Sequence, residues 1–245
     1  MTRTLARSFL TVLPLAALLA LGCDPDVPAK KTEPAVPTTR AAAAKKVKVG
    51  TNVFLEIEGD KRRVLINAYV CLRQGQLEQL LCKRQTKEHE AILAADMDAL
   101  MIHKALLVTG AEAGSPVKYQ PKFEPPRGTT IKVTLQYEQD GKTITVPAQK
   151  WVRNVKTRKD LAYDWVFAGS VLLHDPLDKT APPFYAANSG DVICVSNFDT
   201  ALLDLPINSS QDNAELAFEA NTKVIPPVET PVLVILEPIL KSKKK

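Results

Sequence analysis

The sequence predicts an α+β fold that consists mostly of antiparallel strands and contains two or three helices, the longest at about residues 97–109. Three observations support this class. Several short segments alternate apolar and polar residues, as the strands of a sheet do. One longer stretch is apolar almost all round, as a buried helix is. The predicted elements run as strands, then helices, then strands, and do not alternate as βαβ units.

The first predicted elements are alternating strands at residues 51–58 and 64–72. Gln74-Gly75 predicts a two-residue turn, after which residues 77–83 return as the partner strand of a hairpin. A hairpin of this kind brings neighbouring stretches of chain into one antiparallel pair. The sequence therefore predicts that the strand at 77–83 lies directly beside the strand at 64–72.

Two helices are predicted next. Thr86 begins a short one as its N-cap, and Glu88 and Glu90 lie in the first turn, where the helix dipole favours negative charge. Asp96 begins the longer helix, and Gly110 is a suitable C-cap. The longer helix is expected to be largely buried.

Beyond a proline-rich connection the chain is predicted to be mostly β. The clearest signal is Asp140-Gly141 between strands at 131–137 and 143–146, because this dipeptide favours the tight turn of a hairpin. The remaining predicted elements are an aromatic strand at 164–173, a short buried strand at 191–195, a short Ser-capped helix at 209–218 and a terminal strand at 231–236.

The N-terminus has the pattern of a signal peptide. Two arginines precede an apolar run at residues 8–21 that is too short to span a bilayer comfortably. The Ala-Leu-Gly before Cys23 resembles the lipobox of bacterial lipoproteins. We therefore expect a signal peptide at 1–22, a lipid on Cys23 and a place in the bacterial cell envelope, facing the periplasm or the exterior. The alternative is an ordinary secretory signal in which Cys23 is incidental.

The charge lies at the ends of the chain. Cys23 and residues 24–46, which hold little to bury, are expected to form a disordered tether. The net charge is +5, and the signal, the tether and the basic tail 241–245 carry +2, +2 and +4, which leaves −3 for the predicted globular domain 47–240. A nucleic-acid binder usually has a basic fold, so no nucleic-acid partner is expected. The tail fits anionic lipid headgroups, or it is solvated without a partner.

Three cysteines remain beside Cys23. Cys71, Cys82 and Cys194 form no C-x-x-C pair, so the spacings of iron–sulfur and zinc sites are absent and no cofactor is expected. In the predicted hairpin, Cys71 and Cys82 are about four residues, or roughly 13 Å, apart along the strands. A disulfide needs Cα atoms within about 7 Å, so none is expected between these two.

The stretch RQTKEHEAIL at residues 84–93 contains the main candidate site. A zinc-peptidase helix needs H-E-x-x-H, and Leu93 stands where the second His would be. The inverted motif fails at Gln85. His89 is therefore expected to be half-buried at a helix start. A chemical role stays open: His89, Glu90 and Cys82 are candidate catalytic residues, and His89 and Glu90 are the candidate ligands if any metal binds.

Several runs together resemble one family. They are TKEHEAIL, HKALLVTGAEAGSP, DWVFAGS, GDVICVSNF and LDLPINSSQDNAELAFEANT. Over residues 54–239 the chain resembles the YdjY-domain family of bacterial envelope proteins, especially the lipid-anchored forms of planctomycete-type bacteria. The resemblance implies location and extent and adds little about chemistry. It includes Lys87, His89 and Glu90 in the family's own pattern. The label "ferredoxin-like" sometimes attached to the family is not carried over, because the cysteine spacing for a cluster is absent.

The leading functional hypothesis is a lipid-tethered envelope protein that acts as a binding or structural module, held at the membrane by the lipid on Cys23. Its ligand or envelope partner is not specified by the sequence. The alternative is a metal-dependent or Cys/His-based hydrolase centred on His89.

Overall fold

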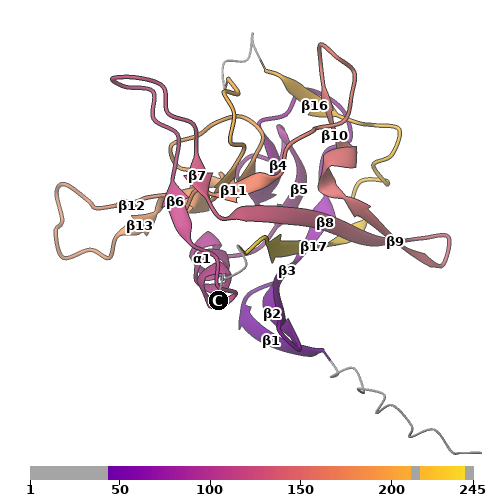
Figure 1. Cartoon of the computed structure of the whole chain (residues 1–245), viewed down its shortest axis with the longest axis horizontal. Helices are drawn as coiled ribbons and strands as arrows, with labels where there is room; N and C mark the ends of the chain where they lie inside the picture. Colours follow the sequence, from indigo (N-terminus) through magenta and orange to yellow (C-terminus); the bar gives the residue numbers. More distant parts are fainter. Residues whose placement is uncertain (1–43, 211–215, 241–245) are drawn as a thin grey trace, which may run out of the picture. The chain divides into compact units, whose positions relative to one another are not determined.

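The structure is a computed structural model that describes residues 44–210 and 216–240. These residues are mostly β: 43% of them are in strands and 9% are helical. Figure 1 shows the single α-helix of this described part, α1 (Ala99–Val108), beside a large curved sheet. The α+β prediction with two or three helices is therefore wrong, and the domain belongs to the mainly β class.

The centre of the domain is a closed barrel of eight strands. The barrel closes because β5 (Ala91–Ala95), at the end of the sheet, pairs with β3 (Lys61–Val70) as well as with β4 (Gln79–Lys83). Around the barrel the strands are β3 (Lys61–Val70), β17 (Pro231–Pro238), β8 (Thr130–Gln139), β11 (Trp165–Phe167), β15 (Leu203–Asp204), β14 (Ile193–Cys194), β4 (Gln79–Lys83) and β5 (Ala91–Ala95). The pairs β4–β5 and β14–β15 are parallel, and the other neighbours are antiparallel.

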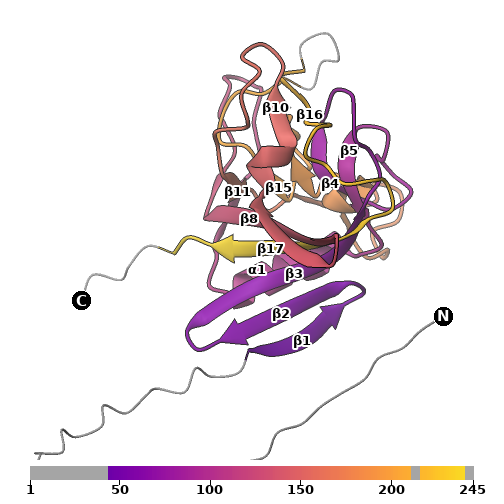
Figure 2. The ribbon, with the colours of Figure 1, turned by 90° about the vertical axis from the view of Figure 1, so that its right-hand side faces the viewer.

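Further strands extend this sheet or form small ribbons (Figures 1 and 2). In both views β1 and β2 lie at one end of the domain, and β10 and β16 lie at the other. The strands β1 (Lys45–Gly50) and β2 (Val53–Glu58) continue from β3, and β9 (Lys142–Pro147) pairs with β8. The ribbons are β6 (Ala113–Ser115) with β7 (Arg127–Gly128), β10 (Val152–Asn154) with β16 (Phe218–Ala220), and β12 (Leu172–Leu173) with β13 (Phe184–Tyr185). Two 3-10 helices are η1 (Ala148–Trp151) and η2 (Ala186–Ser189).

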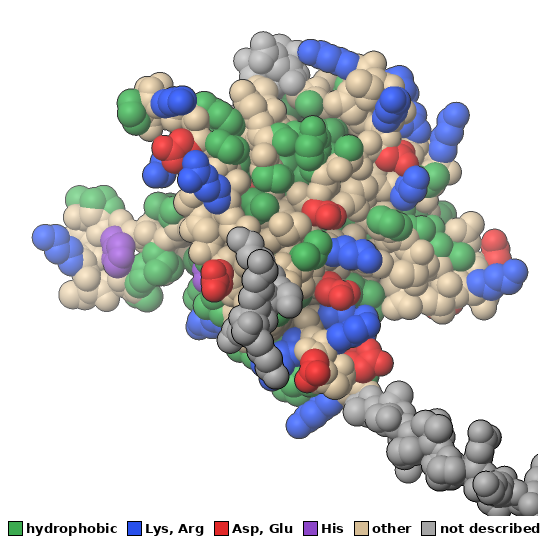
Figure 3. Space-filling model, in the orientation of Figure 1, with side chains coloured by type: hydrophobic (Ala, Val, Ile, Leu, Met, Phe, Trp, Pro, Cys, Tyr) green, Lys and Arg blue, Asp and Glu red, His purple; other side chains and the backbone are tan. Residues whose placement is uncertain are grey.

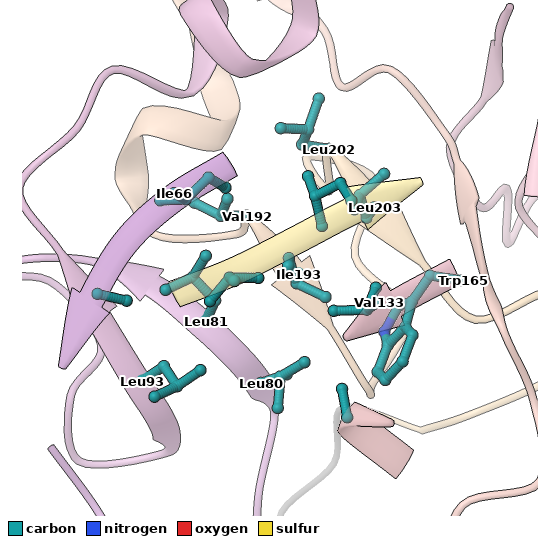
Figure 4. Packing of buried hydrophobic residues seen from close by; sticks show 14 of the residues in the cluster. Ile66, Leu80, Leu81, Leu93, Val133, Trp165, Val192, Ile193, Leu202 and Leu203 are labelled. Carbon is teal, nitrogen blue, oxygen red and sulfur yellow. The ribbon is translucent and has the colours of Figure 1, made fainter. Parts of the chain in front are cut away.

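The core fills the barrel. Inward positions of β8 and β17 alternate with partly exposed ones, as the period of two predicts for strands with one buried face. Trp165 is fully buried and donates its Nε1–H to the carbonyl of Cys194 at 2.7 Å, which ties β11 to β14. Figure 4 shows the packed side chains, among them Ile66, Leu81, Leu93, Val133, Ile193 and Leu203 from six different strands.

The helix α1 forms where the longest helix was predicted. Asp98 caps its N-terminus by accepting a hydrogen bond from the amide of Leu100 at 2.9 Å. At the other end Gly110 has a φ of +91°, and the amides of Gly110 and Ala111 return to the last turn of the helix. The predicted cap at Gly110 is therefore confirmed. The expectation that the helix is largely buried holds for one face only, which carries the buried Ala99, Ile102, Ala105 and Leu106, because Leu107 is 47% exposed.

Of the other two predicted helices, one is wrong and one lies partly outside the described residues. Residues 84–90 form turns, and the strand β5 follows at once, so the short helix from Thr86 is wrong. The run AILAA is fully buried and only five residues long, and periodicity cannot separate a buried strand of this length from a helix. The predicted helix at 209–218 falls partly outside the described residues, and Phe218 begins β16.

The hairpin predicted around Gln74-Gly75 is also wrong. The strand β5 lies between β3 and β4 and pairs with both, and β4 does not pair with β3. The separation expected for Cys71 and Cys82 depended on that hairpin and does not apply. A short segment later in the chain thus displaces the sequence-adjacent partner, which local turn signals cannot show.

The hairpin predicted at Asp140-Gly141 is confirmed. Both residues have positive φ, +51° and +70°, as a type I′ turn requires, and they join β8 to β9. The aromatic strand predicted at 164–173 is shorter, because Gly169 and Ser170 also have positive φ and end it after β11. The predicted signal peptide, Cys23 and the tail lie outside the described residues, and β1 already includes Lys45 and Lys46 of the predicted tether.

Candidate functional site

The turn at residues 84–90 is organised by its own side chains. The carboxylate of Glu88 accepts hydrogen bonds from the amides of Gln85 and Thr86, and the hydroxyl of Thr86 donates to the carbonyl of Lys83. The amide of Glu90 donates to the carbonyl of Lys87 at 3.2 Å. This local network directs Lys87 inward, with 24% of its side chain exposed, while 76% of the His89 side chain is exposed.

Three carboxylates surround the ammonium group of Lys87. Its Nζ lies 3.1 Å from Asp191, 3.5 Å from Glu90 and 3.6 Å from Glu78. The exposed fractions of these acidic side chains are 6%, 19% and 10%. We call Lys87, Glu78, Glu90 and Asp191 the Lys87 cluster. It joins the turn, the residue before β4 and the residues before β14, so the barrel brings together segments that are far apart in sequence.

Neighbouring groups hold the cluster in place. Asp191 accepts hydrogen bonds from the side-chain amide (Nε2) of Gln79 at 3.3 Å and from the hydroxyl of Thr200. The ammonium of Lys87 also lies 4.3 Å from the centre of the Phe198 ring, a cation–π distance. The Oε1 atom of Gln79 is buried and has no hydrogen-bond partner among the residues that the structure describes.

Gly190 permits the close approach of the turn to the segment before β14. A Cβ atom at this position would lie 2.7 Å from the hydroxyl oxygen of Thr86 and 3.0 Å from Cγ of Lys87, and the φ of +128° also favours glycine. The Gly-Asp pair at 190–191 therefore places the carboxylate beside the ammonium because no side chain intervenes.

The electrostatics of the cluster are unbalanced. Burial raises the pKa of Glu78 to about 7, and the hydrogen bond and charge of Glu90 act in the same direction against the opposing Lys87. Burial works to lower the pKa of Lys87, but the charges of Asp191, Glu78 and Glu90 outweigh it and the pKa is raised. Lys87 is therefore charged near neutral pH, and it faces two or three negative charges, depending on whether Glu78 is protonated.

A second polar group lies under the loop that carries Phe198. Asp204 is buried and accepts hydrogen bonds from the side-chain amide of Asn197 and from the backbone amides of Phe198 and Leu205. Burial raises the pKa of Asp204 to about 8 against these three donors. Asn197 also accepts a hydrogen bond from the amide of Ser209 at 2.8 Å. This network holds in place the loop that carries Phe198, whose ring lies beside the ammonium group of Lys87.

The predicted site residues separate in the structure. Glu90 lies in the Lys87 cluster. His89 points to solvent, where its Nε2 is 3.7 Å from Glu90, and Cys82 is fully buried. No hydrogen bond or ion pair of the described residues joins His89 to Cys82. His103 contacts Tyr185 at 2.8 Å and burial lowers its pKa, as expected for a histidine in a structural setting.

Metal ligands do not gather at this site. In residues 44–210 and 216–240 no group of three or more His, Cys, Asp or Glu side chains is arranged to hold an ion. Sequence reasoning missed Glu78 and Asp191, which complete the Lys87 cluster. The available signal was that two of the quoted motifs contribute cluster residues: TKEHEAIL contains Lys87 and Glu90, and GDVICVSNF contains Asp191.

Comparison with known families assigns the chain to one family. The YdjY domain family matches residues 44–237, which include the barrel strands except for Pro238, the last residue of β17, so the chain belongs to the YdjY-domain family. No curated protein and no solved structure matches the chain. Within the described part of the chain no helix is both long and apolar enough to cross a membrane.

Proposed function

We propose that this YdjY-domain protein is a lipid-anchored module of the bacterial cell envelope that binds a cationic ligand, such as a primary amine, at the Lys87 cluster. The observation that carries the proposal is the excess of negative charge: three mostly buried carboxylates face one ammonium group. Uncompensated charge in a partly desolvated place costs stability, and a bound cation would supply the missing counter-charge.

The surroundings of the cluster support a binding role. Phe198 offers a ring face that attracts cations, and it is only partly buried. The unpartnered Oε1 of Gln79 is a hydrogen-bond acceptor that is held beside Asp191 through the amide's other end. A ligand ammonium group donates several hydrogen bonds and so matches acceptors of both kinds.

The site proposal is tested by thermal denaturation with diamines, amino sugars and guanidinium compounds. A compound that binds is expected to raise the melting temperature of the wild-type protein and of the control Glu112→Gln, in which an exposed carboxylate is neutralised. The same compound should have no effect on Glu90→Gln or Asp191→Asn. The proposal fails if no cation raises the melting temperature, or if the rise survives in Glu90→Gln.

The anchor is supported by the apolar leader and the small residues before Cys23. A lipid at this position and the tether that follows would keep the folded domain near a membrane surface. Cys23→Ser is expected to move the protein from the membrane fraction to the soluble fraction of cells. Retention of the variant in membranes would contradict the lipid anchor.

A hydrolase centred on His89 receives less support. General base catalysis needs the base within hydrogen-bond reach of its partner, and His89 is exposed while Cys82 is buried. The raised pKa of Glu78, about 7, beside Glu90 is the feature that would favour acid–base chemistry. A hydrolytic activity that is lost in His89→Ala while the fold is retained would revive this alternative.

A further inference from the structure

A short β-ribbon extends away from the barrel. The strands β12 and β13 form a two-stranded sheet of their own, separate from the barrel sheet. We call residues 171–185, which contain this ribbon and its long connection, the β12–β13 arm. Figures 1 and 3 show the arm reaching out from the body of the domain, with hydrophobic atoms along it. Every residue from 171 to 180 is exposed, so this stretch adds nothing to the core.

The arm carries large apolar side chains in spite of this exposure. They are Val171, Leu172, Leu173, Leu177 and Phe184, with exposed fractions from 37% to 95%. Leu177, in the connection between the two strands, is the most exposed of them. Apolar side chains that gather on one part of a surface mark a contact with a protein or a membrane. The arm is therefore a candidate contact surface.

The body of the domain holds the base of the arm. The amide of Gly169 donates to the carbonyl of Leu202 at 3.1 Å. The hydroxyl of Tyr185 donates to the carbonyl of Gly169 at 2.9 Å and lies 2.8 Å from Nδ1 of His103 on α1. Tyr185 itself is buried. Because both ends of the arm are fixed, its apolar side chains are presented on one side of the barrel.

The connection between the two strands satisfies part of its own backbone. The carboxylate of Asp175 accepts hydrogen bonds from the amides of Leu177 at 2.8 Å and Asp178 at 3.3 Å. The carboxylate of Asp178 accepts from the amide of Thr180 at 2.9 Å and from its hydroxyl at 2.6 Å. An amide that loses water without gaining a partner costs free energy, so these bonds make approach to an apolar medium less costly.

The charges beside the apolar residues have both signs. Asp175 and Asp178 are negative, and Lys179 is positive. A zwitterionic headgroup layer contains phosphate and ammonium groups, so it can pair with both signs. A strongly anionic surface would repel the two carboxylates. The composition of the arm therefore fits zwitterionic lipid better than anionic lipid.

The apolar area of the arm is small for a protein partner. Five side chains, most of them about half exposed, provide on the order of a few hundred Å², whereas each partner of a standard interface buries about 800 Å². A bilayer needs no such area when a lipid on Cys23 already holds the domain nearby. Residues 24–43, between that cysteine and the described domain, reach at most about 70 Å. The anchor thus keeps the arm close to lipid.

We propose that the β12–β13 arm inserts its apolar side chains into the zwitterionic lipid surface to which Cys23 tethers the domain. This inference rests on the proposed lipid anchor. A single attachment at Cys23 limits the distance of the barrel from the bilayer but leaves its orientation open. The arm supplies a second contact and fixes which side of the barrel faces the membrane.

The native tryptophans permit a fluorescence test. Trp151 and Trp165 are 1% and 0% exposed, so lipid leaves their surroundings unchanged. Leu177→Trp places a reporter in the arm. Val224→Trp places a matched reporter at a 43% exposed apolar position in the loop after β16, which lies away from the arm in Figure 1. Both positions are exposed, so neither substitution disturbs the core.

The full-length chain with each substitution is expressed in bacteria, purified from membranes and reconstituted into vesicles of phosphatidylethanolamine and phosphatidylcholine. Vesicles with brominated acyl chains are compared with the same vesicles without bromine. We expect bromine to quench the emission of Leu177→Trp and to leave that of Val224→Trp unchanged. Adding Leu173→Asp to Leu177→Trp should remove the quenching, because a carboxylate in the arm opposes insertion. Circular dichroism checks that each variant is folded.

Three results would overturn the proposal. The first is that bromine does not quench Leu177→Trp. The second is equal quenching of both reporters, because the domain would then lie against lipid without a preferred side. The third is a shift in the emission of Leu177→Trp that grows with protein concentration in the unlipidated Cys23→Ser chain without vesicles, because the arm would then bind a second copy of the chain.

The anchor is judged separately, from the mass of the peptide that contains Cys23. If that peptide carries no lipid, the same reporter variants are mixed with the same vesicles. Failure of the anchor is thus distinguished from failure of the arm to insert.

Discussion

Removal of the central cation is the sharpest structural test of the Lys87 cluster. Lys87→Met keeps the length of the side chain and leaves Asp191, Glu78 and Glu90 without their ammonium partner. Breaking a fully buried pair costs about 3–5 kcal/mol, because the remaining charge is uncompensated. Since a quarter of the Lys87 side chain is exposed, we expect a loss of about 2 kcal/mol in the free energy of unfolding at pH 8.

The loss should depend on pH through Glu78. The pKa of Glu78 is about 7 in the folded protein, above its ordinary value, so the stability linked to its protonation is present at low pH and is lost as the pH rises towards 7. Lys87 opposes this rise in pKa, and its removal raises the pKa further. At pH 5.5 the protonated Glu78 relieves the repulsion, and the cost of Lys87→Met should fall to about 1 kcal/mol.

Urea denaturation at both pH values measures these energies. With a slope of about 2 kcal/mol per molar urea, the midpoint at pH 8 should fall by about 1 M. Lys104→Met, which changes an exposed lysine of α1, is the control and should shift the midpoint little. A Lys87→Met protein as stable as the control at pH 8, or one whose deficit grows at pH 5.5, would refute the reasoning.

Three further predictions concern the fold. Gly110→Ala places a side chain at a φ of +91° and should cost about 1 kcal/mol in thermal denaturation; an unchanged melting temperature would contradict the cap assignment. Trp165→Phe leaves the carbonyl of Cys194 without its donor and should cost about 1–3 kcal/mol in urea denaturation, whereas a neutral result would mean that water replaces the indole. Burial raises the pKa of Asp204 to about 8, so ionisation lowers stability as the pH rises from about 4 to 8, and Asp204→Asn should flatten that part of the profile; an equally steep variant would assign the slope elsewhere.

The sequence could predict the parts of the fold that local residues determine. The turn at Asp140-Gly141 and the end of α1 at Gly110 depend on neighbours along the chain. The start of α1 was predicted two residues early, at Asp96, whereas Asp98 is the N-cap. Barrel closure depends instead on β5, which lies between β3 and β4 and runs parallel to β4. Five apolar residues have no readable period, and the hairpin signal at Gln74-Gly75 gives no indication of a strand that arrives later.

The candidate site could be predicted only in part, because its residues come from segments that are far apart along the chain. Glu90 was a candidate from its residue type, and Lys87 entered through the family resemblance. Glu78 belongs to a segment that was predicted only as a strand, and Asp191 is 112 residues away from Gln79, its hydrogen-bond partner in the barrel. His89 drew attention as a chemically versatile residue, but the turn directs it to solvent. Only the closed barrel brings the four residues of the Lys87 cluster together.

The central functional claim is that the Lys87 cluster binds a cation through its excess of negative charge. The most direct measurement is a calorimetric titration of the protein with a primary diamine at pH 7, repeated in buffers of different ionisation enthalpy. Glu78, which faces Glu90, Lys87 and Asp191, has a pKa of about 7 and should lose part of its proton on binding. The account predicts saturable binding with proton release, both abolished in Asp191→Asn. The account would be contradicted if the titration gave no binding heat. It would also be contradicted if the diamine bound without proton release and this binding persisted in Asp191→Asn.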